Sequence, residues 1–171
     1  MELQVREMRL DEIPPVINYF YSSTPEHLEM LGVDPTRLPP KDAWTSLFEA
    51  QFSLPVPKRR GCFAIWLMDG RAIGFSSCDK IVFGEQANMH LHVTEPSLRQ
   101  QGIGAQCVRE SVDLYFRALE IKQLFCEPHA FNIGPNRTLQ RAGFRYVKTY
   151  MTVPGPLNFH QAVNRWLIER P

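Results

Sequence analysis

The chain has 171 residues, of which 44% are hydrophobic, and this length suffices for one domain with a sizeable core. Its formal charge of +1 gives no reason to expect nucleic acid or a membrane surface as a partner. No apolar stretch approaches the ~20 residues of a membrane span, and the N-terminus lacks the apolar core of a signal peptide. The four cysteines show no Cys-x-x-Cys spacing and are expected to be buried, reduced thiols. Together these features favour a single cytoplasmic domain over residues 1–171.

Strand and helix patterns alternate along the chain without repeats. Asp69-Gly70 is a strong signal for a two-residue hairpin turn, and Asp11 is expected to cap the first helix. Residues 23–60 contain six prolines and give the least guidance. In chain order, the expected elements are a strand at 3–8, a helix at 12–22, a short helix at 43–48, strands at 62–68, 71–77 and 86–94, a helix at 102–119, a strand at 123–126, a helix ending at Gly143, a strand at 145–153, and a strand or helix at 162–168.

A glycine-rich segment, Arg99-Gln100-Gln101-Gly102-Ile103-Gly104-Ala105, joins the alternating strand at 86–94 to the periodic helix at 102–119. The first N–H groups of a helix have no internal partners, and the helix dipole favours negative charge there. Glycines let a phosphate approach the main chain, so the segment predicts an anion site. It is not a Walker loop, because Gly104 is not followed by Lys-Ser/Thr, nor a dinucleotide fingerprint, because a third glycine is missing.

This Arg-x-x-Gly-x-Gly motif resembles the acyl-CoA pyrophosphate loop of the GNAT superfamily of N-acetyltransferases. Asn132, followed eleven and twelve residues later by Gly143 and Phe144, reproduces a second spacing common in that family. Gly143 is expected to end a helix in the left-handed conformation, and Phe144 to return to the core. The string Glu-Pro-x-x-x-Asn that begins at Glu127 also resembles a variant found in aminoglycoside-type and related small-amine acetyltransferases.

The resemblance implies an α+β fold: a single GNAT-type domain with a mixed sheet of about seven strands and about four helices. Its fourth and fifth strands would run parallel and splay apart, so that the pantetheine arm of acetyl-CoA inserts between them. Pro96 follows Val93 by three residues instead of the usual two, so either Thr94 takes the apolar position or the strand's bulge is shifted. The residues implied in acetyl-CoA binding are Val93, Thr94, Glu95, Arg99, Gln100, Gln101, Gly102, Ile103, Gly104, Ala105, Asn132 and Asn136.

Acetyl transfer needs a general base for the amine, a backbone donor for the oxyanion and a proton for the thiolate, but no metal. His90 and His92 are two apart on a strand and share one face, and imidazole titrates near neutral pH. With the glycine motif they weakly resemble arylalkylamine N-acetyltransferases, in which such a pair relays the proton; the spacing is two residues shorter here. Glu127, across the gap, is the competing base, and simple packing remains open for each histidine.

The general acid has no clear candidate. Where many family members carry a tyrosine or a serine, this chain has Leu139 and Pro135. Asn136 could offer an amide or cap a helix, and Tyr146 or Tyr150 would serve only if their strand face points inward. Water is the remaining acid.

The sequence therefore predicts an N-acetyltransferase that uses acetyl-CoA and a primary amine, as a monomer or homodimer. Trp44, Phe48 and Phe52 recur at helical spacing and either pack onto the core or form a lid with an apolar underside. If the lid lines the acceptor site, a small amine is preferred over a protein N-terminus or lysine. Glu26 or Glu29 would lie near the ammonium. A catalytically inactive acetyl-CoA sensor is the other alternative, favoured by the missing acid and disfavoured by the candidate bases.

Overall fold

One mixed sheet of seven strands organises the computed structural model, which describes residues 1–99 and 101–171. The spatial order is β1-β2-β3-β4-β5-β7-β6, with β4 and β5 parallel and every other neighbouring pair antiparallel. The predicted seven strands and the parallel pair are therefore confirmed. The strands are β1 (Leu3–Glu7), β2 (Cys62–Met68), β3 (Arg71–Val82), β4 (Gln86–Val93), β5 (Gln123–Cys126), β6 (Arg145–Thr152) and β7 (Gln161–Glu169).

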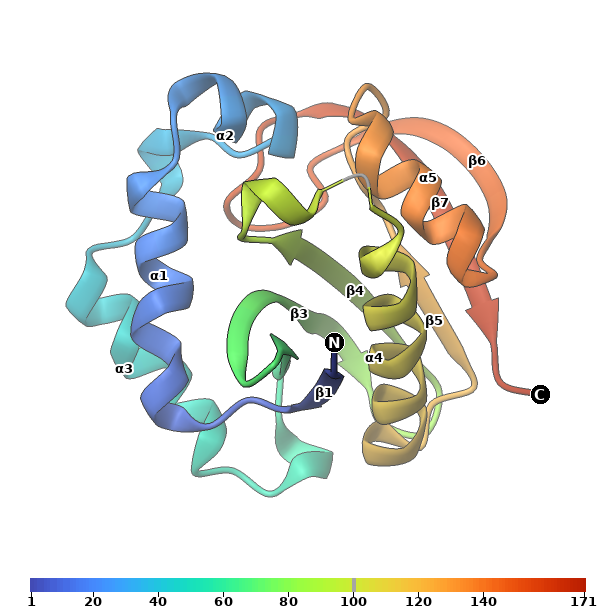
Figure 1. Cartoon of the computed structure of the whole chain (residues 1–171), viewed down its shortest axis with the longest axis horizontal. Coiled ribbons are helices and arrows are strands. Elements are labelled where there is room, and N and C mark those ends of the chain that lie inside the picture. Colours follow the sequence, from blue (N-terminus) through green and yellow to red (C-terminus); the bar gives the residue numbers. More distant parts are fainter. Residues whose placement is uncertain (100) are drawn as a thin grey trace.

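Helices cover both faces of this sheet, with α1, α2 and α3 on one side and α4 and α5 on the other (Figure 1). Two apolar clusters follow from this layering. One joins the sheet to α4 and α5 and includes Trp66 and Tyr115, whereas the other joins it to α1, α2 and α3 and includes Phe20 and Phe75. Within the described residues the helices are α1 (Ile13–Ser22), α2 (Pro25–Leu31), α3 (Lys41–Phe52), α4 (Ile103–Leu119) and α5 (Ile133–Ala142).

Helix α2 is one helix more than the sequence predicted, and it lies in the proline-rich segment. Its signals are local: the Thr24 hydroxyl accepts the N–H of His27 at 3.2 Å, Pro25 begins the first turn, and Gly32 ends the helix at φ 73°. The predicted cap of α1 is wrong, because Asp11 lies in a 3-10 turn. Glu12 occupies the cap position, and its carboxylate binds Arg6 and the Arg9 N–H instead of an N–H of α1. The prolines in the first turn of α1 have no N–H groups, so fewer unpaired N–H groups remain for a capping side chain to bind.

The Asp69-Gly70 hairpin is confirmed, since both residues have positive φ, 48° and 78°, as a primed turn requires. Strand β3, however, runs beyond the predicted end at residue 77. Its register to β4 shifts between Asp79 and Val82, where Lys80 takes φ 47°. Regular pairing thus continues two residues past the predicted end, so that Asp79 lies opposite Asn88, and the irregularity follows on the side of the turn.

A buried hydrogen-bond network fixes α4 on the sheet. The Ser111 hydroxyl accepts from Trp66 Nε1 at 2.8 Å and from Ser76 Oγ at 3.0 Å, and Ser76 also lies 2.9 Å from the Tyr115 hydroxyl. All four side chains are buried and partnered, which makes the network rigid. The middle of α4 is thereby fixed on β2 and β3.

Strands β4 and β5 pair only as far as Met89 opposite Cys126. Beyond this point β4 continues to Val93, while the chain after β5 turns away and forms a bridge between His129 and Val163. The predicted splay between the parallel strands is therefore present. A gap opens where main-chain groups of β4 have no neighbouring strand.

The shifted bulge, the second of the two alternatives for β4, is the one observed. Both Thr94 and Glu95 donate their N–H to the carbonyl of Ile73, at 2.9 and 3.3 Å, which is the hydrogen-bond pattern of a bulge. Alternation along an antiparallel ladder then directs the main-chain groups of Leu91 and Val93 away from β3 and into the gap. Of these two, Val93 already accepts Arg99 Nε at its carbonyl, at 3.1 Å.

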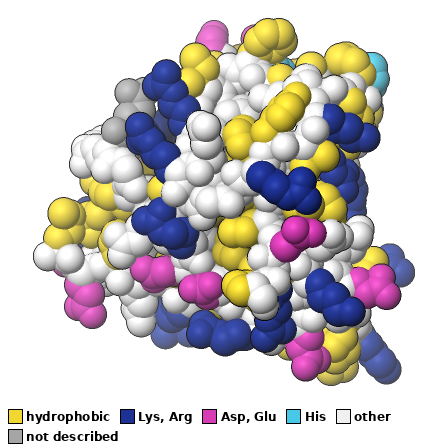
Figure 2. Space-filling model, turned by 90° about the vertical axis from the view of Figure 1, so that its right-hand side faces the viewer, with side chains coloured by type: hydrophobic (Ala, Val, Ile, Leu, Met, Phe, Trp, Pro, Cys, Tyr) yellow, Lys and Arg dark blue, Asp and Glu magenta, His cyan; other side chains and the backbone are white. Residues whose placement is uncertain are grey.

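The surface on the β6 side mixes lysine and arginine side chains with carboxylates and apolar patches (Figure 2). Strand β6 is an edge strand, and its apolar residues Tyr146 and Met151 are more than half exposed. All four cysteines are buried and free of disulfide bonds, as predicted. None of the helices in the described part of the chain has the length and apolar character that crossing a membrane needs.

Candidate active site

The two glycines of the predicted anion loop have different structural roles. Gly102 precedes α4 at φ 79°, and a Cβ added there would meet no atom of the described residues within 4 Å. A Cβ at Gly104 would instead lie 3.5 Å from Thr138 and 3.8 Å from Val93, facing the packed interior. Gly102 thus leaves the approach to the helix N-terminus open, whereas a Cβ at Gly104 would make ordinary van der Waals contacts with α5 and β4. Gln100 lies outside the described residues.

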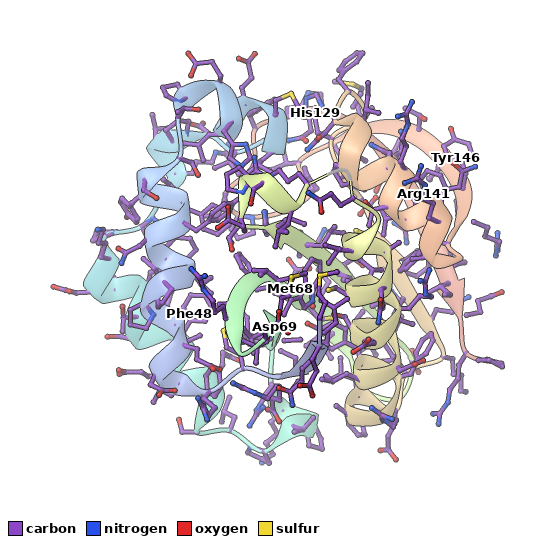
Figure 3. The ribbon with its side chains drawn as sticks, viewed as in Figure 1. Phe48, Met68, Asp69, His129, Arg141 and Tyr146 are labelled. Carbon is purple, nitrogen blue, oxygen red and sulfur yellow. The ribbon has the colours of Figure 1, made fainter. Side chains whose placement is uncertain are left out.

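A small cavity of about 60 Å³ lies where β4 and β5 splay. Leu91 from β4, Glu127 after β5 and Asn132 before α5 are among the residues that line it. His129 lies at the end of the molecule where α2 and α5 approach each other (Figure 3). The cavity therefore joins the unpaired main chain of β4 to the segment that carries the second predicted motif.

A larger cavity of about 330 Å³ lies between the sheet and the helices α1 and α3, under the β6–β7 connection. His90 and His92 line this cavity and also the small cavity in the gap. The predicted common face of the two histidines is therefore observed, and it forms the boundary between two chambers. Their environments, however, are different.

His90 forms an ion pair with a carboxylate that the sequence analysis did not single out. Its Nε2 lies 3.0 Å from Asp79 Oδ1, and both side chains are about one third exposed because they line the cavity. Burial lowers the pKa of His90, but the Asp79 carboxylate outweighs burial and the net shift is upward. The pKa of Asp79 is lowered, because the neighbouring His90 outweighs the effect of burial. The pair thus stabilises a protonated imidazole.

His92 is held among aromatic rings. It stacks on Phe75 with centroids 4.9 Å apart, and the rings of Phe20 and Tyr19 lie at 5.2 and 5.3 Å. Burial, with help from the nearby positive groups of His90, His27 and Arg99, lowers the pKa of His92 to about 3. Its imidazole is therefore neutral near neutral pH and poorly able to hold a proton, which matches the packing alternative.

Glu127 lies at the gap as predicted, but its oxygens are already engaged. They accept Asn88 Nδ2 at 3.1 Å, Arg165 Nη1 at 3.5 Å and the Tyr150 hydroxyl, and the side chain is only 4% exposed. Burial and this carboxylate raise the pKa of Tyr150. Such a carboxylate supports the wall of the gap and has little free capacity to accept a proton from a substrate.

The other positions considered for a general acid supply no free proton donor at the gap, and Leu139 only marks the place where many family members carry a tyrosine. Leu139 is fully buried in the core, and the half-exposed Tyr146 pairs with the Thr149 hydroxyl at 2.7 Å. Asn136 donates to the carbonyls of His129 and Asn132, and its Oδ1 accepts from β7 side chains. The Asn136 amide thus holds α5 against β7. It does not cap the helix, because Asn136 lies inside α5 and Asn132 occupies the N-cap position.

Two of the three aromatic residues of the predicted acceptor lid lie at a cavity. Trp44 and Phe48 of α3 line the large cavity, but Phe52 stacks on Phe63 at 6.0 Å and does not line it. The carboxylate in the cavity is Asp79, whereas Glu26 and Glu29 are exposed on α2 and do not line it. Sequence reasoning missed Asp79 because it placed the end of the strand two residues earlier.

The known proteins that this chain resembles share one fold. A family model described as an acetyltransferase (GNAT) domain matches residues 2–145. The chain belongs to the GNAT acetyltransferases. The predicted family and the predicted acyltransferase activity class are thereby confirmed, while a search of curated protein sequences finds no significant match.

Solved structures place this GNAT acetyltransferase among proteins with varied acceptors. An aminoglycoside acetyltransferase, AAC(6')-Ib, in complex with coenzyme A has 15% identity and a TM-score of 0.71, covering 99% of this chain and 95% of the other. RimL, a ribosomal-protein alpha-N-acetyltransferase in complex with coenzyme A, has 16% identity and a TM-score of 0.75, covering 98% and 93%. Spermidine N-acetyltransferase from Vibrio cholerae, in complex with CoA and spermine, has 14% identity and a TM-score of 0.77, covering 98% and 95%. At such identities the likeness shows the fold and not the acceptor.

Proposed function

We propose that this protein transfers the acetyl group of acetyl-CoA to a small primary amine by direct attack, with His90 as the general base. The observation that carries the proposal is the place of His90, which lines both the gap and the large cavity and pairs with Asp79. The thioester would enter through the gap and the amine through the cavity. His90 would then lie where the two reactants meet.

The donor side rests on the gap and on α4. Pantetheine would run along the unpaired main chain of Leu91 and Val93, and the diphosphate would lie at the open N-terminus of α4 beside Gly102. Thr94 and Glu95 would contribute by shaping the bulge, because their N–H groups are already bonded to Ile73. The neighbours crystallised with coenzyme A or acetyl-CoA support this placement. The remaining loop residues, Arg99, Gln100, Gln101, Ile103, Gly104 and Ala105, and the gap residue Asn132 are retained as proposed cofactor contacts.

Asp79 would determine which nitrogen of His90 acts as the base. Because Nε2 of His90 faces the carboxylate, Nδ1 is the nitrogen that can accept a proton from the substrate ammonium. The free amine then attacks the thioester carbon, a C–N bond forms, and the C–S bond breaks to release the CoA thiolate. An N–H of β4 at Leu91 or Val93 would stabilise the oxyanion. We propose water as the acid for the thiolate.

The whole chain would act as one catalytic unit. Strands β6 and β7 lie largely beyond the matched residues 2–145, yet they complete the same sheet, which supports one domain over residues 1–171. Four free cysteines fit a reducing compartment such as the cytoplasm. We retain a monomer or homodimer as the proposed assembly.

Release of CoA from acetyl-CoA in the presence of small amines tests this function directly. We expect thiol release that depends on both substrates and N-acetylated product detected by mass spectrometry. A sensor would bind acetyl-CoA, and so raise the melting temperature, without releasing CoA. Acetylation confined to N-terminal peptides or protein lysines would instead support a protein acetyltransferase.

The donor site has its own test in Gly102→Val. A Cβ at Gly102 projects into open space beside the N-terminus of α4, so its side chain should exclude the diphosphate and abolish the rise in melting temperature that CoA produces. Gly84→Val is a matched control, because Gly84 has the same φ of 79° and the same open surroundings, in the β3–β4 turn. Both variants should carry similar backbone strain. Equal CoA-induced shifts in the two would contradict the loop assignment.

A further inference from the structure

The large cavity has aromatic walls. Its floor is formed by Phe63 and Phe75 of the sheet, and its roof by Phe20 of α1 with Trp44 and Phe48 of α3. These rings contact one another, with centroids 4.7 Å apart between Phe48 and Phe63 and 5.4 Å between Phe20 and Trp44. Phe48 lies between the helical layer and the sheet in Figure 3. A ligand in this cavity would therefore be surrounded by apolar surface.

The cavity is lined by few charged side chains, and the negative and positive ones lie at different ends. Among the described residues that line it, Asp79 is the only carboxylate and Arg60 the only basic side chain besides the histidines. Asp79 lies beside His90, whereas Arg60 is exposed, as is Leu47, which places both at the mouth. A ligand thus meets one negative group at the reacting end and one positive group at the entrance.

From this arrangement we infer that the acceptor is a primary amine with a single positive charge, carried on an apolar body of about one aromatic ring. This inference rests on the proposed function and names its substrate class. The ammonium would lie near Asp79 and His90, and the body would occupy the cavity along the aromatic rings that line it. A volume of about 330 Å³ is at the small end of ligand pockets, which typically span ~300–1,000 Å³.

Polyamines and aminoglycosides, the acceptors named for the structural neighbours, fit this cavity poorly. Their additional ammonium groups would be buried among aromatic rings without carboxylate partners, which is costly. Arg60 at the mouth would repel them as well. The acyl chain of a long acyl-CoA is also disfavoured as the occupant. The proposed base His90 lines this cavity, and the amine must reach His90 through it.

The test compares kcat/KM for 2-phenylethylamine, ethylamine, spermidine, kanamycin and an N-terminal peptide, with acetyl-CoA as donor. We expect 2-phenylethylamine to exceed each of the others at least about tenfold, since one methylene in an apolar pocket is worth ~10–200-fold. Ser77→Leu fills the cavity floor and should lower the ratio of 2-phenylethylamine to ethylamine by about tenfold or more. Because ethylamine uses the same base, damage to His90 cancels in this ratio.

Leu47→Trp is a second variant, at the exposed mouth of the cavity, and it does not disturb the core. It should also lower the ratio of kcat/KM for 2-phenylethylamine to that for ethylamine. Ser46→Leu on the exposed face of α3 is the matched control and should leave the ratio unchanged. A higher kcat/KM for spermidine, kanamycin or the peptide, a preference for longer acyl-CoA with ethylamine, or an unchanged ratio in both variants would overturn the inference.

Calorimetric binding of 2-phenylethylamine to the protein–CoA complex separates this inference from the proposed function. Selective binding that Ser77→Leu weakens, without any CoA release, would uphold the cavity assignment and refute acetyl transfer. Absence of binding and of turnover with this amine would refute the cavity assignment. Efficient transfer to another amine class would uphold the proposed function and overturn only the substrate class.

Discussion

Replacing His90 by glutamine is expected to lower kcat by about 10²–10⁴-fold, the usual contribution of a positioned general base. Glutamine preserves polarity and approximate size but cannot accept the proton of the ammonium at neutral pH. Because His90 faces the cavity and not the N-terminus of α4, the rise in melting temperature with CoA should remain. Steady-state kinetics and a CoA thermal-shift titration on the same preparation would check both outcomes.

Two comparisons make this result specific to His90. His160→Gln, at an exposed position in the β6–β7 connection, should behave as the wild type. His92→Phe preserves the aromatic stack on Phe75 and should lose less activity than His90→Gln. If the His92 variant loses more, or if His90→Gln retains wild-type turnover, the proton passes through His92, Glu127 or water instead.

Much of the α4 side of the fold was predictable because its signals are local. A glycine with positive φ ends α5 at Gly143, a primed turn at Asp69-Gly70 pairs β2 with β3, and helical periodicity marks α4. Each of these features depends on neighbours within a few residues. Helix α2 also carried local signals, in Thr24 and Gly32. It has only seven residues, however, and this is too short for apolar residues to show a clear helical periodicity.

The candidate site was less predictable because it depends on register between distant strands. Asp79 lies near His90 because β3 keeps one regular register with β4 from Gly74 to Asp79, two residues beyond the predicted end of the strand. Likewise, the different environments of the two histidines come from Phe75, Tyr19 and Phe20, which belong to other elements. Periodicity places two histidines on one face, but it carries no information about the residues that face them.

The second large effect is expected from Asp79→Asn, which should lower kcat by at least about tenfold and up to the ~10²–10⁴-fold contribution of the base itself. Asp79 raises the pKa of His90. Without Asp79, burial and the charge of Lys80 lower this pKa, and only the smaller effect of Glu127 raises it, so the pKa falls. The acidic limb of the kcat profile, where His90 becomes protonated and inactive, should therefore move to lower pH. An asparagine amide can also donate to Nε2, which favours the tautomer that carries its proton on Nδ1.

The pH profile distinguishes this positioning role from a structural one. A residue that only supports the fold would lower the rate at every pH without moving the acidic limb. The exposed Asp113→Asn on α4 is the matched control and should leave both the rate and the limb in place. An Asp79→Asn enzyme with the wild-type limb would show that the imidazole does not titrate in catalysis. The general base would then have to be sought at Glu127, whose oxygens would first have to be released from Tyr150 and Arg165.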